Sequence, residues 1–234
     1  MHLLLFDIDG TLVRVNGTGR TAVTDALSSV TGRPVSTDGI TLSGRTDPAI
    51  IEAVLEKNGV ASTQDTVEEA IAAYVDAMKS TLTASDVEVL PGVQALVSAL
   101  HDHSDVHLGL VTGNVEPIAY EKLAVQDLDH YFPVGAFGSD HADRNQLPEL
   151  ATRRAADRTG RTLSSAEHAV VVGDTAHDIE CARAAGARAV AVCTGRYDRT
   201  ELKPHEPDLL LDSLPSMETF LQQLPGIVTK TETT

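Results

Sequence analysis

The stretch LLLFDIDGT, residues 3–11, decides the fold. Four apolar residues in a row are typical of a strand covered on both faces, as in a parallel sheet flanked by helices. Two carboxylates, Asp7 and Asp9, follow directly, and Gly10 supplies a bend. Because ligands of open α/β sheets collect at the carboxyl ends of the strands, these carboxylates are candidate catalytic groups. The alternative is an Asx turn that only leaves the strand.

A second predicted strand, residues 106–111, also ends in polar groups. It is followed by Thr112, Gly113 and Asn114. A hydroxyl and an amide beside a glycine suit an anion, because the glycine lets backbone N–H groups approach closely. This strand end is therefore a candidate phosphate-binding site.

A third predicted strand, residues 169–172, ends in GDTAHD, residues 173–178, and contributes Asp174 and Asp178. Four carboxylates at the ends of three neighbouring strands would repel one another strongly. A bound Mg²⁺ is the simplest way to hold them together, because it prefers oxygen ligands. The three strand ends together indicate phosphate chemistry more strongly than any one of them alone.

With these motifs the chain resembles the haloacid dehalogenase-like hydrolases, specifically the Mg²⁺-dependent phosphatase branch with a helical cap, which includes phosphoglycolate phosphatases and β-phosphoglucomutases. DIDGT at 7–11 matches the first motif, TGN at 112–114 the second, and GDTAHD at 173–178 the fourth. The third motif usually presents a Lys, and residues 138–148 contain none. Arg144 is the nearest cation in a suitable place, and it would clamp phosphate oxygens bidentately.

The resemblance implies a role for each residue. Asp7 would attack phosphorus to give an aspartyl-phosphate, and Asp9 would protonate the leaving alcohol and then activate water. Asp7 and Asp174, with the backbone carbonyl of Asp9, would bind Mg²⁺, while Asp178 would act through water or behind the ligands. The groups expected to bind phosphate are Thr112, Gly113, Asn114 and Arg144.

Strand patterning stops at about residue 13 and resumes near residue 89. Three helical stretches are predicted between these points, at about 18–31, 48–58 and 66–82. We therefore predict an α/β fold in which residues 1–14 and 89–234 form a doubly wound, mainly parallel sheet with a Rossmann-like core. Residues 15–88 form an inserted helical cap.

The cap contains the polar loop SGRTD, residues 43–47, just before a predicted helix. Asp47 is the expected N-cap, because Pro48 follows in the first turn. A cap over the strand ends can contact the leaving group of a substrate. Arg45 is therefore the candidate for binding a second anionic group on the substrate.

Composition limits the classes of partner that we expect this chain to bind. The chain has 34 acidic and 18 basic residues, a net charge of −16, which disfavours nucleic acid and anionic membranes. No segment approaches the ~20 apolar residues that span a bilayer, and the opening apolar run is too short for a signal peptide. We expect a cytoplasmic enzyme that acts on a small phosphorylated metabolite. Cys181 and Cys193 are expected to be reduced, and residues 229–234 to be frayed.

Other functions fit the same sequence less well. A dehalogenase would have no use for Asp9, and a phosphonate-cleaving relative would need a cap lysine, whereas Lys57 and Lys79 lie in predicted helices. A non-enzymatic phosphate- or metal-responsive module of receiver type would need neither Asp9 nor a cap. A sugar-phosphate mutase would use the same core, and the sequence leaves that alternative open, as it does the oligomeric state.

Overall fold

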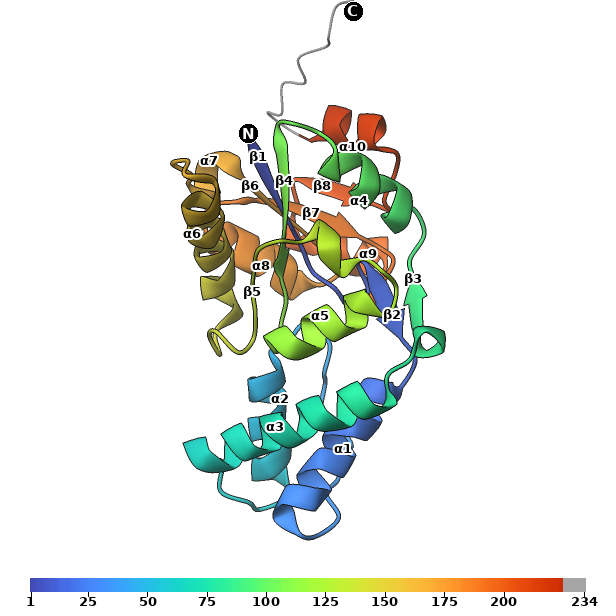
Figure 1. Ribbon diagram of the computed structural model, residues 1–234, viewed down its shortest axis with the longest axis vertical. Coiled ribbons are helices and arrows are strands. Elements are labelled where there is room, and N and C mark those ends of the chain that lie inside the picture. Colours follow the sequence, from blue (N-terminus) through green and yellow to red (C-terminus); the bar gives the residue numbers. More distant parts are fainter. Residues whose placement is uncertain (225–234) are drawn as a thin grey trace, which may run out of the picture.

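The computed structural model describes residues 1–224 of the 234-residue chain, so the predicted fraying of residues 229–234 lies outside the described residues. Within this range, a parallel sheet with helices on both faces forms one end of the molecule, and a group of helices forms the other (Figure 1). This arrangement confirms the predicted doubly wound sheet with a helical cap.

The sheet has the strand order β5-β4-β1-β6-β7-β8, and every neighbouring pair is parallel. Its strands are β1 (His2–Phe6), β4 (Val106–Val111), β5 (Gly135–Ala136), β6 (Ala169–Gly173), β7 (Arg188–Val192) and β8 (Leu209–Leu211). The order of the strands along the chain reverses between β1 and β6. That reversal is the switch point at which open α/β sheets bind ligands.

Alternate residues of β1 divide the core into two layers. Leu4 and Phe6 belong to the layer that contains α4 (Val93–His101), α5 (Glu116–Ala124) and α10 (Met217–Gln223). Leu3 and Leu5 belong to the opposite layer, with α6 (Leu147–Thr159) and α8 (Ala176–Ala184). Since all four side chains are fully buried, the continuous apolar run at residues 3–6 corresponds to a strand that is covered on both faces.

The chain leaves the core through β2 (Val13–Val15) and returns through β3 (Val87–Val89), which pair as an antiparallel ribbon. Between them lie α1 (Thr18–Thr31), α2 (Asp47–Lys57) and α3 (Gln64–Thr81), each within two residues of its predicted bounds. The predicted N-cap of α2 was wrong. Thr46 caps this helix by accepting from the Ala49 N–H, and Asp47 lies inside it with its carboxylate turned to the core.

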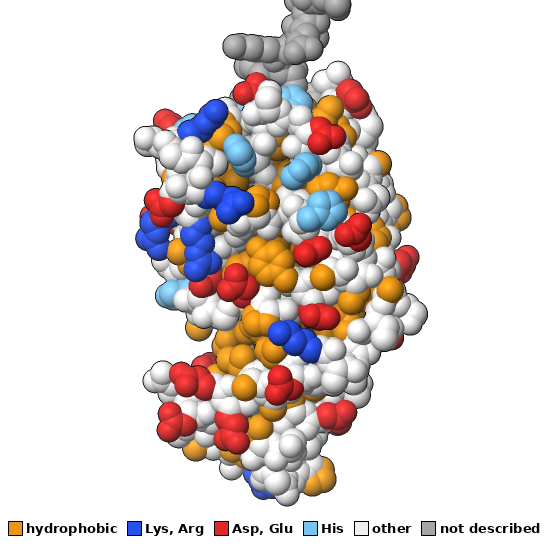
Figure 2. All heavy atoms as spheres, in the orientation of Figure 1, with side chains coloured by type: hydrophobic (Ala, Val, Ile, Leu, Met, Phe, Trp, Pro, Cys, Tyr) orange, Lys and Arg blue, Asp and Glu red, His pale blue; other side chains and the backbone are white. Residues whose placement is uncertain are grey.

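The visible surface mixes charges of both signs, and basic side chains gather over α6, which contributes Arg153, Arg154 and Arg158 (Figure 2). In the part of the chain that the structure describes, no helix combines the length and the apolar character needed to cross a membrane. The thiols of Cys181 and Cys193 are free, and burial raises the pKa of the Cys181 thiol to about 12.

Replacing a leucine in the middle of the sheet should destabilise the fold far more than the same change at its edge. Leu110 is fully buried in β4, so Leu110→Ala should lower the free energy of unfolding by about 2–5 kcal/mol. Leu211→Ala on the edge strand β8, where the side chain is partly exposed, is the matched control and should cost less. Urea unfolding measures both, and equal losses would contradict the assignment of β4 to the sheet interior.

Candidate active site

Three buried carboxylates converge where β1 and β6 end. Asp7 follows β1, while Asp174 and Asp178 follow β6, and each offers an oxygen within 4.8 Å of the others. Their exposed fractions are 5%, 2% and 2%. Ionised carboxylates are costly to bury without compensating charge, so this cluster requires cations.

Arg144 supplies one of those cations. It begins the short 3₁₀ helix η3 (Arg144–Gln146) that follows β5, and its guanidinium is buried. One terminal nitrogen lies 3.0 Å from the Asp7 carboxylate and 2.5 Å from that of Asp178. The structure therefore brings the candidate cation of the third motif into direct contact with the first and fourth motifs.

A single guanidinium does not balance the cluster. Burial raises the pKa of Asp7 to about 7; Asp178 and Asp9 add to the rise, and Arg144 opposes it. Burial also raises the pKa of Asp174 well above its usual range, and the neighbouring carboxylates add to that shift. Such an excess of buried acidic oxygens fits a hard divalent cation such as Mg²⁺.

Asp178 differs from its two neighbours in how its oxygens are used. One oxygen accepts from the backbone N–H and the hydroxyl of Thr175, at 3.0 and 2.7 Å, in a capping box at the start of α8. The other accepts from Arg144. With both oxygens engaged, Asp178 is placed to orient Arg144, and Asp7 and Asp174 are the carboxylates better suited to hold a metal ion.

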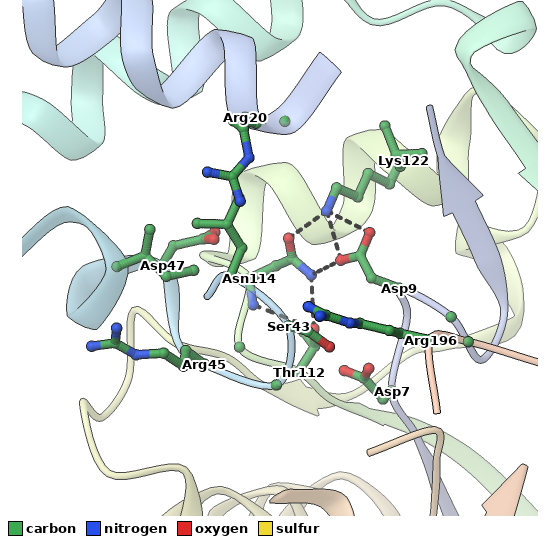
Figure 3. A pocket seen from close by; sticks show the side chains of 18 of the residues that line it. Asp7, Asp9, Arg20, Ser43, Arg45, Asp47, Thr112, Asn114, Lys122 and Arg196 are labelled. Carbon is green, nitrogen blue, oxygen red and sulfur yellow. Dashed lines mark hydrogen bonds and ion pairs between the residues drawn. The ribbon is translucent and has the colours of Figure 1, made fainter. Parts of the chain in front are cut away.

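The carboxylate of Asp9 points away from this cluster and meets a residue that the sequence did not suggest. Lys122 on α5 donates to both Asp9 oxygens, at 2.9 and 2.7 Å, and to the side-chain oxygen of Asn114 at 2.6 Å. The Asn114 amide also donates to Asp9 at 2.7 Å. Figure 3 shows Lys122 and Asn114 converging on Asp9. The position of the Asp9 carboxylate is thus fixed by two donor side chains.

A signal for Lys122 was present in the sequence. Ile118, Ala119 and Leu123 are buried on the same helix, and Lys122 lies among them on the inner face, only 5% exposed. A lysine at an apolar helical position must find a partner, because a buried ammonium without one is strongly disfavoured.

Thr112 and Asn114, predicted to bind phosphate, lie side by side at the end of β4. The fully buried Thr112 hydroxyl oxygen accepts from the backbone and the side chain of Asn114, at 3.3 and 2.9 Å. These two bonds leave the hydroxyl proton of Thr112 available to an acceptor. The Asn114 side chain is already committed to Asp9, Thr112 and Lys122.

The loop before α2 docks on the same strand end. The backbone N–H of Asp47 donates to the Gly113 carbonyl at 2.7 Å, and the Asp47 carboxylate accepts from the Val115 N–H at 2.9 Å. A Cβ on Gly113 would lie 2.2 Å from the Arg45 carbonyl oxygen, so only glycine admits the loop. Burial raises the pKa of Asp47 to about 6.

Arg45, predicted to meet a second anionic group on the substrate, donates to the Ala49 carbonyl at 2.8 Å. It lines the cavity, but its guanidinium is directed away from Asp7 and Asp9 (Figure 3). The cavity itself has a volume of about 450 Å³ and lies between cap and core. Its wall includes Asp7, Asp9, Thr112 and Arg144, so the predicted groups share one space.

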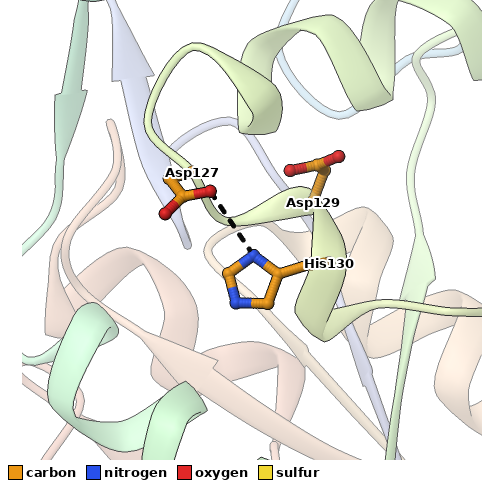
Figure 4. A group of neighbouring side chains, drawn as sticks. All are labelled: Asp127, Asp129 and His130. Carbon is orange, nitrogen blue, oxygen red and sulfur yellow. Dashed lines mark ion pairs between the residues drawn. The ribbon is translucent and has the colours of Figure 1, made fainter.

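A second group of potential metal ligands lies elsewhere on the core. Asp127, Asp129 and His130 are neighbours after α5 (Figure 4). His130 is 3.7 Å from the Asp127 carboxylate, whose side chain is 98% exposed. An exposed pair of this kind is screened by water, and it has no connection to the cavity.

Comparisons with known proteins agree with this geometry. Residues 4–192 match the family described as haloacid dehalogenase-like hydrolase. A phosphoglycolate phosphatase of Salmonella paratyphi A is 34% identical over 125 residues, which is 53% of this chain and 48% of that protein. The match therefore spans about half the length of that relative.

Longer matches also exist. The plasmid phosphoglycolate phosphatase of Cupriavidus necator is 31% identical over 225 residues, 93% of this chain and 92% of that protein. A solved β-phosphoglucomutase from Clostridium difficile aligns with a TM-score of 0.70 at 18% identity, over 95% of this chain and 96% of that one. At this identity the solved structure shows a shared fold only.

The raised pKa values make Mg²⁺ binding depend on pH. In the metal-free protein Asp7 holds a proton below about pH 7, and the pKa of Asp174 is also raised, so a cation must displace protons as pH falls. The apparent Mg²⁺ affinity should rise from pH 6 to pH 8, by up to about tenfold per unit for each proton displaced.

Calorimetry in buffers of different ionisation enthalpy counts the protons released. Asp7→Asn should bind Mg²⁺ more weakly and release fewer protons. Asp25→Asn, at an exposed position of α1, serves as the control. Equal affinity at pH 6 and pH 8 would contradict a metal site built on these carboxylates.

Proposed function

The chain belongs to the haloacid dehalogenase-like hydrolases, and from that premise we propose that it is a Mg²⁺-dependent phosphatase that hydrolyses a small phosphomonoester through an aspartyl-phosphate on Asp7. The observation that carries the proposal is the contact of the Asp7 carboxylate with Arg144, beside Asp174 and at the wall of a cavity. The phosphatase names of the relatives support the same activity.

Asp7 and Asp174, with the backbone carbonyl of Asp9, would hold Mg²⁺. When bound, the ion supplies positive charge that offsets the negative charge on the phosphoryl oxygens. The excess of acidic groups around a single arginine supports this assignment. We place the cap at residues 15–88, where the chain passes through β2 and β3.

The protein groups then divide the reaction into two steps. In the first, an Asp7 oxygen bonds to phosphorus, the ester P–O bond breaks, and Asp9 gives its proton to the leaving oxygen. In the second, Asp9 takes a proton from water as the water oxygen attacks phosphorus, and the bond between phosphorus and the Asp7 oxygen breaks, which releases phosphate and restores the Asp7 carboxylate. Arg144 holds Asp7 in place, and Thr112 donates its free proton to a phosphoryl oxygen.

Lys122 would act on Asp9 and not on the substrate. Its two hydrogen bonds to Asp9, with the one that Asn114 donates to Asp9, hold this carboxylate at one place on the cavity wall. A general acid must lie within hydrogen-bond reach of the oxygen it protonates, so its position limits the rate. Lys122 is therefore a positioning residue.

A panel of small phosphomonoesters assayed with Mg²⁺ and with EDTA tests the activity. Metal-dependent release of inorganic phosphate is the expected result, and no release from any ester would contradict it. A sugar-phosphate mutase would instead convert a sugar phosphate to its isomer without a matching release of phosphate. Analysis of the organic product therefore separates the two reactions.

Asp7→Asn should abolish turnover while leaving the fold nearly intact, because it removes the nucleophile with little change in volume. The loss should be at least about a thousandfold, more than a change in stability explains. Phosphate release and thermal unfolding are measured together, with the exposed Asp25→Asn variant as the control for a lost charge. Turnover comparable to the parent would exclude Asp7 as the nucleophile.

Lys122→Met should slow the hydrolysis of an alkyl phosphate roughly tenfold or more and that of p-nitrophenyl phosphate less. An alkoxide needs a proton from Asp9 to leave, whereas p-nitrophenolate leaves readily without one. The effect should fall on kcat more than on KM. Lys79→Met, an exposed lysine of the cap, is the control, and Lys122→Arg should restore part of the rate. Equal losses on both esters would argue for a structural role only.

A further inference from the structure

The cavity has one cationic side chain with no partner in the described chain. Six cationic residues line it: Arg14, Arg20, Arg45, Lys122, Arg144 and Arg196. Each of the first five donates to a carboxylate, a side-chain amide or a backbone carbonyl. Arg196 forms no hydrogen bond or ion pair with any group in residues 1–224, in a chain whose net charge is −16.

The backbone that carries Arg196 is fixed against the active site. The Thr194 hydroxyl donates to the Gly10 carbonyl at 2.7 Å, and Arg14 donates to the Thr194 carbonyl at 2.8 Å. Gly195 packs so closely on Asp174 that a Cβ there would lie 1.7 Å from the carboxylate oxygen. The backbone of Arg196 is therefore held in place by its neighbours in the loop, and the preceding residue, Gly195, contacts the carboxylate cluster.

The side chain extends from this loop into the cavity, toward the space in front of Asp7 (Figure 3). A guanidinium forms strong paired hydrogen bonds with carboxylate or phosphate oxygens. Asp9 and Asp47 also line the cavity, but they already accept hydrogen bonds from Lys122 and from the Val115 N–H, so the charge that remains available to an anion beside the phosphoryl group is that of Arg196.

We propose that Arg196 is a specificity-determining residue that binds a second anionic group of the substrate, a carboxylate or a second phosphate close to the ester oxygen. The proposal rests on the proposed phosphatase activity and narrows its substrate class to small, doubly anionic esters. It places this recognition on the core, in the loop after β7, and not on the cap. Arg45 is the cap residue that the sequence predicted for this recognition, but its guanidinium donates a hydrogen bond to the Ala49 carbonyl.

The test compares the phosphate ester of a short hydroxy acid with the ester of the corresponding hydroxy amide, which lacks the second charge. Arg196→Ala should lower kcat/KM for the carboxylate ester about ten- to hundredfold, and for the amide ester much less. Arg196→Lys should recover part of the loss. A short-chain bisphosphate forms a third arm, which separates a second phosphate from a carboxylate as the preferred group.

Arg199→Ala is the matched control, because Arg199 begins the short helix α9 (Arg199–Leu202) directly after this loop, pairs with Asp212 and does not line the cavity. It should leave both rates unchanged. Arg45→Ala tests the cap alternative. A selective loss in Arg45→Ala without one in Arg196→Ala would overturn the proposal, as would equal losses of Arg196→Ala on the charged and the neutral ester.

Binding gives a second readout that needs no turnover. Phosphonoacetate carries a carboxylate and methylphosphonate does not, so only the former should lose affinity in Arg196→Ala when calorimetry is performed with Mg²⁺. If the parent hydrolyses the neutral ester but Arg196→Ala treats both ligands alike, the Arg196 assignment alone fails. If the parent releases phosphate from no ester in the panel, the phosphatase activity fails, and the substrate class inferred from it fails with it.

Discussion

The site depends on burying more negative charge than one arginine can balance. Asp7, Asp174 and Asp178 are held together by the order of the strands, which ends β1 and β6 side by side. Such a cluster destabilises the folded state, because each ionised carboxylate loses its hydration on burial. The surrounding backbone accommodates it. Gly10 has a φ of +87°, and a Cβ there would lie 2.4 Å from the Asp174 carboxylate oxygen, so no larger residue fits.

Helix α5 connects two parts of the site that are far apart in the sequence. At its start, the Val115 N–H donates to Asp47 of the cap. Two turns later, Lys122 donates to Asp9 of the core. The contact that seats the cap loop and the contact that positions the proposed acid and base therefore share one rigid element. This arrangement gives a physical route by which cap docking can influence the chemistry.

Local patterns were sufficient for the strands and for the acidic motifs. β1, β4 and β6 are apolar runs with polar ends, and such runs need no distant information. The partners of single side chains did not follow from such patterns. Lys122 pairs with Asp9, which is 113 positions away in the sequence. The N-cap of α2 is Thr46 and not Asp47, because the Asp47 carboxylate accepts from the distant Val115 N–H. Arg196 differs from the other five cations that line the cavity only because each of those five has a hydrogen-bonding partner in the described chain.

The position of β1 also sets the order in which the protein can assemble during synthesis. Residues 3–6 emerge from the ribosome before both of their hydrogen-bonding neighbours, which are β4, whose Val106 pairs with His2, and β6, whose Ala169 pairs with Leu3. At about 5–20 residues per second, the strand waits several seconds for its first partner and longer for its second. The whole helical cap is made in that interval. The segment that ends in Asp7 is thus an apolar part of the nascent chain that stays unpaired while the cap is made. The pairing of β6 with β1 is then the step that brings Asp174 and Asp178 beside Asp7.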